Sequence, residues 1–196
     1  MPLSAASPRE PLHIRTVTCK GYLRDDGMWD IEGHLTDAKT YGFDNAHRGH
    51  VEPGNPVHDM WIRLTVDNDF QVRDAEAATD ASPYSICPAI TVNFERLKGL
   101  TIGPGWRKQI HARLGGAHGC THLVELLGPI ATTAYQTIHS AKARARREAQ
   151  KANDDPRDDP RGESARPRLL NTCHAFGESS PVVQKYWPDF YKAPDA

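Results

Sequence analysis

The sequence predicts an α+β fold in which a four-stranded antiparallel meander packs against a long kinked helix and shorter helices. Apolar and polar residues alternate in four segments before Ala78, as on strands with one buried face. Apolar residues then recur at helical spacing from Leu123 to Ile138. A sheet of this size is stable only when another layer covers one face, so we expect the helix to lie on it.

The predicted strands are, in order, Leu12–Leu23, Met28–Phe43, Pro56–Asp67 and Phe70–Ala77. The first two are joined by the turn signal Asp25-Asp26-Gly27, which is typical of a hairpin. The stretch Asp44–Pro56, with its late glycine and prolines, is predicted to be a loop.

Two short helices are expected over Ala89–Leu97 and Arg107–Leu114, each ended by glycine. Thr121 is the expected N-cap of the main helix. Pro129 lies inside that helix and has no N–H to donate, so a kink or a restart is expected there.

The domain organisation follows from shifts in composition along the chain. We expect a flexible arm over 1–11, a single α+β domain over 12–152, a flexible linker over 153–168 and a tail over 169–196. The linker is almost devoid of apolar residues, whereas the tail regains aromatic and branched side chains. The tail is therefore expected to dock back on the domain.

The charge balance excludes several kinds of partner. Lys and Arg number 24 and Asp and Glu number 25, which gives a formal net charge of −1 and predicts no affinity for nucleic acid or anionic membranes. No apolar run is long enough for a membrane span, and the N-terminus has no signal-peptide layout. The four cysteines form no CxxC motif, so we expect reduced thiols in the cytoplasm. The expected partner is a small-molecule ligand, and the oligomeric state is left open.

A thiol and imidazoles gather at the start of the main helix and in the tail. Cys120 at a helix N-terminus favours the thiolate, which is a nucleophile or a soft metal ligand, and His122 lies two residues on. Together with Cys173 and His174, these residues are the predicted metal ligands, for zinc or iron, if the tail folds back. A buried structural cysteine beside a capping histidine is the alternative.

A second polar set is predicted on one face of the sheet. If the polar faces of the second and third strands coincide, an imidazole, carboxylates and a guanidinium converge around an indole: Glu32, His34, Asp59, Trp61 and Arg63. A wet sheet face with cross-strand ion pairs explains the same pattern. His58 belongs to the apolar face instead, where a desolvated imidazole near the helix start is a candidate base.

Two further aromatic residues are candidate substrate contacts beside Trp61 and Arg63. Tyr84 follows the meander, and Trp106 ends a Gly-Pro-Gly-Trp segment. The sequence holds no GxGxxG, no P-loop, no GxSxG and no HExxH motif, which excludes nucleotide binding and the common hydrolase signatures on sequence grounds.

Several long strings resemble one bacterial family catalogued as a domain of unknown function. They include RDDGMWDIEGHLTD, PVHDMWIRLT, GCTHLVELL and, in the tail, NTCHAF. The resemblance is expected to run from about Leu12 to the tail. It implies that the segments holding His58-Asp59, Cys120/His122 and Cys173/His174 belong to the pattern of the family, which has no assigned general activity.

Three hypotheses of function follow. The first is a small-molecule enzyme, a lyase or hydrolase acting on a carbonyl or aromatic catabolite, with catalytic residues among His58, Asp59, Glu32, His34, Cys120 and His122. The second is a metal- or iron–sulfur-binding carrier that also uses Cys87. The third is a non-catalytic accessory protein whose basic helix end docks a partner. For the enzyme, we expect either no cofactor or, as the alternative, a zinc or iron ion.

Overall fold

The computed structural model describes residues 3–153, 166–167 and 169–194 of the chain. The chain divides into two compact units, 1–146 and 147–196, and each is described by itself. The predicted linker over 153–168 lies outside the described residues except at 153, 166 and 167. Within the described residues, no helix is long and apolar enough to cross a membrane.

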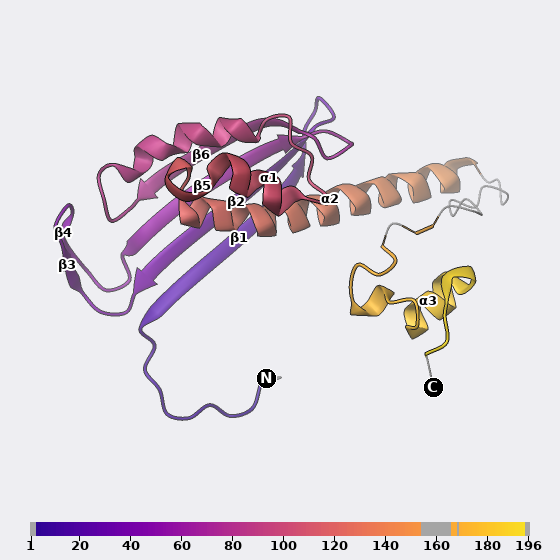
Figure 1. Cartoon of the computed structure of the whole chain (residues 1–196), viewed down its shortest axis with the longest axis horizontal. Helices are drawn as coiled ribbons and strands as arrows, with labels where there is room; N and C mark the ends of the chain where they lie inside the picture. Colours follow the sequence, from indigo (N-terminus) through magenta and orange to yellow (C-terminus); the bar gives the residue numbers. More distant parts are fainter. Residues whose placement is uncertain (1–2, 154–165, 168, 195–196) are drawn as a thin grey trace. The chain divides into compact units, whose positions relative to one another are not determined.

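The first unit is built on the predicted four-stranded antiparallel meander (Figure 1). Its strands, in spatial as well as chain order, are β1 (His13–Leu23), β2 (Trp29–Lys39), β5 (Pro56–Val66) and β6 (Val72–Ala81). The alternation seen in the sequence is exact in β2, where every second residue from Trp29 to Asp37 is buried. The α+β fold class is therefore confirmed.

The predicted loop over Asp44–Pro56 contains a second, two-stranded hairpin, so that prediction was wrong in part. Strands β3 (Phe43–Asn45) and β4 (Gly49–Val51) pair antiparallel. The Asn45 side chain accepts hydrogen bonds from the backbone N–H groups of His47 and Arg48, which closes the turn between the strands. Short runs of this kind lack the alternation that identifies longer strands.

Helices cover one face of the sheet, as Figure 1 shows for α1 (Trp106–Leu114) and α2 (Thr121–Asn153). Two glycines let α2 approach the strands closely. A Cβ on Gly33 would lie 2.7 Å from Ile130 Cδ1, and one on Gly21 would lie 2.1 Å from Thr137 Oγ1. The core between the layers includes Ile31, Leu64, Phe94, Leu127 and Ile130, all fully buried.

Several helix boundaries differ from the prediction. The segment predicted as a short helix over Ala89–Leu97 is the 3₁₀ helix η1 (Cys87–Leu97), and a 3₁₀ turn, η2 (Gly116–His118), precedes α2. Thr121 is the first helical residue rather than the N-cap, because the Cys120 carbonyl already accepts a bond from Val124 N–H. Helix α2 continues through Pro129 without a restart.

The second unit contains η3 (His174–Phe176), α3 (Pro181–Tyr186) and η4 (Pro188–Phe190). The Ser180 hydroxyl caps α3 by accepting from Val183 N–H at 3.1 Å, and Val183 is buried. The tail was predicted to hold a short helix and an edge strand; its described part has the helix and no strand. Docking of this tail on the first unit stays a prediction.

Candidate functional site

A row of polar side chains crosses the helix-covered face of the sheet. The strand register places Arg15 of β1, Asp37 of β2 and His58 of β5 side by side. His122, in the first turn of α2, meets this row from the helix layer, and its ring lies 3.8 Å from the His58 ring. Three strands and a helix therefore bring charged and titratable groups together at one end of an otherwise apolar interface.

Asp37 is the anchor of this cluster. Its side chain is only 1% exposed, yet it is fully engaged. Arg15 donates from Nε to Oδ1 at 2.8 Å and from Nη2 to Oδ2 at 2.9 Å, and His13 Nε2 lies 2.9 Å from Oδ1. Arg15 also donates from Nη1 to Glu125 Oε2 of α2 at 2.6 Å, so the helix holds the guanidinium in place.

The cluster fixes the charge state of each member. Burial by itself would raise the pKa of Asp37, but the hydrogen bonds from Arg15 and His13 outweigh it and lower that pKa to about 2. Burial lowers the pKa of both His58 and His122, and it outweighs the opposing attraction of Asp37. At neutral pH the centre is therefore one carboxylate facing two neutral imidazoles.

The three donors face a common point. His58 Nδ1 lies 3.2 Å and His122 Nε2 lies 3.8 Å from Asp37 Oδ2, and one ligand atom from each residue falls within 4.8 Å of the other two. His58 Nδ1 is buried and makes no hydrogen bond within the described part of the chain. Two neutral imidazoles and a carboxylate at these separations form a donor set suited to a divalent zinc or iron ion.

A sulfur pair adjoins the other nitrogen of His122. Cys120 Sγ lies 3.9 Å from His122 Nδ1 and 3.8 Å from Met60 Sδ. Since His122 Nε2 faces Asp37, the imidazole stands between a thiol and a buried carboxylate. The predicted pairing of Cys120 with His122 at the helix start is thus present, although the separation is too long for a strong hydrogen bond.

The predicted polar set occupies the opposite, open face of the sheet. As predicted, the polar residues of β2 and β5 lie next to one another on this face, because the strand register pairs Glu32 with Arg63 and His34 with Trp61. His34 Nε2 lies 2.6 Å from Asp59 Oδ1, and its ring stacks on the Trp61 indole with 3.5 Å between centroids. The proposed acid–base residues are therefore divided between two faces, with His58 on one and Glu32, His34 and Asp59 on the other.

Two predicted substrate contacts, Trp106 and Tyr84, make no hydrogen bond or ring contact with either cluster within the described residues. Trp106 is a core residue, 6% exposed, whose Nε1 donates to the Leu127 carbonyl at 3.1 Å. Tyr84 lies on the surface, where its ring makes an edge-to-face contact with the His47 ring. Arg63 is engaged by Glu76 and Glu32 and remains on the open face with Trp61.

The predicted metal set spans the two units of the chain. Cys120 and His122 lie in the first unit, whereas Cys173 and His174 lie in the second. Cys87 begins η1, and the cysteines are free thiols. Of the predicted ligands, only His122 belongs to the carboxylate and imidazole cluster described above.

Sequence reasoning missed Asp37 and the groups that hold it, His13, Arg15 and Glu125. One signal for Asp37 was present: it follows Trp29, Ile31 and Leu35 at even spacing and so falls on the buried face. A carboxylate at such a position needs a cationic partner. The partners themselves depend on strand register and on the helix position, which alternation does not specify.

Comparison with known proteins identifies a family and no activity. The model of a family described as "Protein of unknown function (DUF2889)" matches residues 13–136. That range contains every member of the Asp37 cluster, from His13 to Glu125, and stops before the tail, so the expected extension of the resemblance to Cys173-His174 is not part of the match. No curated protein matches the chain, and no solved structure does.

Proposed function

The chain belongs to the DUF2889 family, and we propose that it is a small-molecule enzyme whose centre is Asp37, His58 and His122 with a bound divalent metal ion. The proposed reaction is a hydrolase or lyase step on a carbonyl compound, with an aromatic catabolite as the substrate class expected from the sequence. Zinc and iron(II) are the ions that this donor set favours.

The buried His58 Nδ1 is the observation that carries the proposal. It makes no well-aligned hydrogen bond in the described chain, although the Asp37 carboxylate lies only 3.2 Å away. Leaving such a nitrogen unsatisfied costs about 1–3 kcal/mol. A metal ion shared with His122 and Asp37 would satisfy it, and the lowered pKa of each imidazole keeps its nitrogen available for coordination at neutral pH.

The surrounding residues have the roles expected around such an ion. Arg15 and His13 hold Asp37 in one orientation, and Glu125 holds Arg15. Three protein ligands leave coordination positions for water and substrate, which is typical of catalytic rather than structural metal sites. An ion bound there would supply a Lewis acid for a carbonyl oxygen and lower the pKa of a bound water.

Metal content tests this function. Protein purified without added metal is expected to hold about one zinc or iron ion per chain by elemental analysis, since three ligands suffice for a catalytic site. His58→Ala and His122→Ala should each lose it. His34→Ala is the matched control, because His34 also pairs with an aspartate but lies on the open face. Folded protein that neither contains nor takes up zinc or iron would exclude the proposal.

The Cys120 geometry favours a second candidate, a thiol-dependent enzyme of the same reaction class. His122 would accept the Cys120 proton at Nδ1, and Asp37 would orient the ring through Nε2. The two candidates differ in one variant. Cys120→Ser should keep the metal and leave a metal-dependent activity largely intact, whereas it should abolish a thiol-dependent activity.

A further inference from the structure

The outer edge of β1 is long, regular and unpaired. β1 is the outermost strand of the four-stranded sheet (Figure 1), and no strand lies beyond it in the part of the chain that the structure describes. Its ladder with β2 runs through all eleven residues without a register shift, and the strand contains no proline. The backbone N–H and C=O groups that point outward along such an edge are a template for a further strand.

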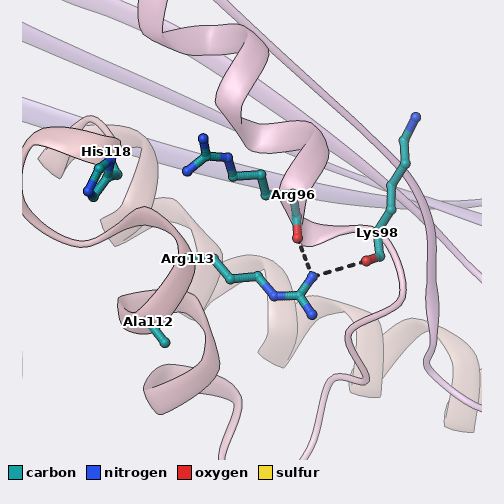
Figure 2. Close-up of a pocket in the computed structure, with 5 residues that line it drawn as sticks. All are labelled: Arg96, Lys98, Ala112, Arg113 and His118. Atoms are coloured by element: carbon teal, nitrogen blue, oxygen red, sulfur yellow. Dashed lines mark hydrogen bonds between the residues drawn. The ribbon is translucent and has the colours of Figure 1, made fainter.

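The opposite edge of the sheet, at β6, is protected. Val72, at the start of β6, donates to the Leu100 carbonyl at 2.8 Å. Arg113 holds the segment before Leu100 in place, because its guanidinium donates to the carbonyls of Arg96 and Lys98, as the dashed lines in Figure 2 show. The β5–β6 ladder also has a register shift near each end. Bulges and a covering segment commonly protect edge strands, and the described residues provide neither for β1.

Large apolar side chains are exposed along β1 on both faces of the sheet. The register with β2 places Ile14 and Tyr22 on the open face, where they are 55% and 44% exposed. Val17 and Leu23 lie on the helix-covered face and are still 42% and 62% exposed, so α2 leaves the edge uncovered there. Exposed apolar side chains beside an unpaired edge are typical of an interface between proteins.

We propose that β1 pairs with β1 of a second copy of this chain, antiparallel about a two-fold axis that passes through Thr18 perpendicular to the sheet. Thr18 is the middle residue of β1, so this register pairs all eleven residues and joins the two sheets into one of eight strands. It places Ile14 of each copy opposite Tyr22 of the other, and Thr18 opposite Thr18. Cross-strand pairs of these kinds stabilise antiparallel sheets, and a two-fold interface must be self-complementary in this way.

The charges on β1 are compatible with this register. Lys20 of one copy lies opposite Thr16 of the other, and Arg15 lies opposite Gly21, so no like charges face each other directly. Arg15 is in addition already paired with Asp37 at 2.8 Å. A pairing centred on Lys20 would instead bring two ammonium groups together, which is unfavourable.

Pairing would also cover one side of the Asp37 cluster. His13, which contacts Asp37 at 2.9 Å, is 46% exposed at the end of β1. In the proposed register it lies opposite the exposed Leu23 of the second copy. The dimer does not depend on a metal ion at the cluster, so its test is separate from that of the proposed function.

Sedimentation of the full chain tests the proposal, and a species of twice the monomer mass is expected. Thr18→Lys should raise the dimer dissociation constant about fivefold, because it places like charges directly opposite each other. An equal mixture of Thr18→Lys and Thr18→Asp should associate more tightly than either variant alone. Ala78→Lys is the matched control, since it adds the same charge at an exposed position on β6 and should leave the dimer unchanged.

Three outcomes of these measurements would overturn the proposal. The first is a chain that stays monomeric at about 100 μM, well above the dissociation constant of a stable dimer. The second is a mixture of the two Thr18 variants that associates no better than each alone. The third is an equal loss for Thr18→Lys and Ala78→Lys, which would place the interface elsewhere.

Disulfide formation tests the register itself. Directly opposite residues have Cα atoms about 4.5–5.5 Å apart, so Thr18→Cys should link two chains on mild oxidation. Thr16→Cys is the matched control on the same face of β1, because its two copies would be about 13 Å apart along the strands. Oxidation of the unchanged chain gives the background from its four cysteines. Linkage at Thr16→Cys equal to or greater than that at Thr18→Cys would overturn the proposed pairing.

Discussion

The two faces of the sheet carry similar residues in contrasting environments. On the helix-covered face, Asp37 is 1% exposed and meets His58 and His122. On the open face, Asp59 is 25% exposed and makes a 2.6 Å contact with His34. The inner imidazoles have lowered pKa values and an unsatisfied nitrogen, whereas the outer pair is already satisfied and in contact with water. The burial of Asp37 and His58, rather than residue type, makes the inner cluster the candidate centre, since His122 at 26% is about as exposed as His34 at 27%.

The largest difference in stability between the two faces is expected when one aspartate on each face, Asp37 or Asp59, is replaced by asparagine. The pKa of Asp37 falls from 3.8 to about 2, which corresponds to about 2–3 kcal/mol of stability at neutral pH. Asp37→Asn should therefore lower the free energy of unfolding by about that amount in urea titrations. Asp59→Asn, at a half-buried pair on the open face, should cost less than about 1 kcal/mol. Similar costs for the two variants would remove the distinction between the faces.

Two tryptophans extend the comparison to apolar side chains. Trp29 is 5% exposed on the inner face and donates from Nε1 to Asn68 Oδ1, whereas Trp61 is 39% exposed and donates to Asp80. Trp29→Phe should lower the free energy of unfolding by about 1–2 kcal/mol through lost packing in the core. Trp61→Phe keeps an aromatic ring against His34 and should cost less than about 0.5 kcal/mol. Denaturant midpoints measure both, and a larger loss at Trp61 would contradict this comparison.

The sequence predicts which residues lie on each face of the sheet, because this assignment depends only on local patterns. Alternation in the second and third strands correctly placed His58 with the apolar set and Glu32, His34 and Asp59 with the polar set. It also located Cys120 and His122 at the start of the main helix. These are local properties, which the periods of strands and helices determine.

The inner cluster itself required information that local patterns do not contain. Arg15 meets Asp37 only through the β1–β2 register, and His122 meets His58 only because α2 lies across the strands. Gly21 and Gly33 permit that position by leaving room for Thr137 and Ile130. A sequence shows such glycines but not which helix residue fills the space above them.

The pH dependence of stability is the third expected difference. The pKa of each inner imidazole lies below its unfolded value of 6.5, so below that pH the unfolded chain binds more protons than the folded one. In the metal-free protein, stability should therefore be full above about pH 6.5 and fall as the pH is lowered. It should fall again between about pH 4 and pH 2 as Asp37 is protonated.

Urea midpoints of the metal-free protein, measured from pH 8 to pH 5, test the first of these two transitions. Replacing both His58 and His122 by Asn should flatten the fall, whereas His34→Asn on the open face should leave it in place. An unchanged pH profile in the double variant would show that the inner imidazoles do not govern it.

The smallest effect on stability is expected from replacing Glu125. This replacement nevertheless tests the proposed metal binding of the inner cluster most directly. Arg15 and Glu125 are 37% and 53% exposed, so Glu125→Gln should cost less than about 0.5 kcal/mol. Glu76→Gln is the matched control on the open face, where Glu76 pairs with Arg63 at similar exposure.

The two glutamates should differ in metal binding. Because Glu125 holds Arg15, and Arg15 orients Asp37, its replacement should weaken zinc binding about tenfold in competition with a chelating dye. Glu76→Gln should leave zinc affinity unchanged. Equal zinc affinities in the two variants would show that the Arg15–Glu125 ion pair has no role in metal binding. A loss confined to Glu125→Gln would show that α2 positions the carboxylate through Arg15 as well as supplying His122.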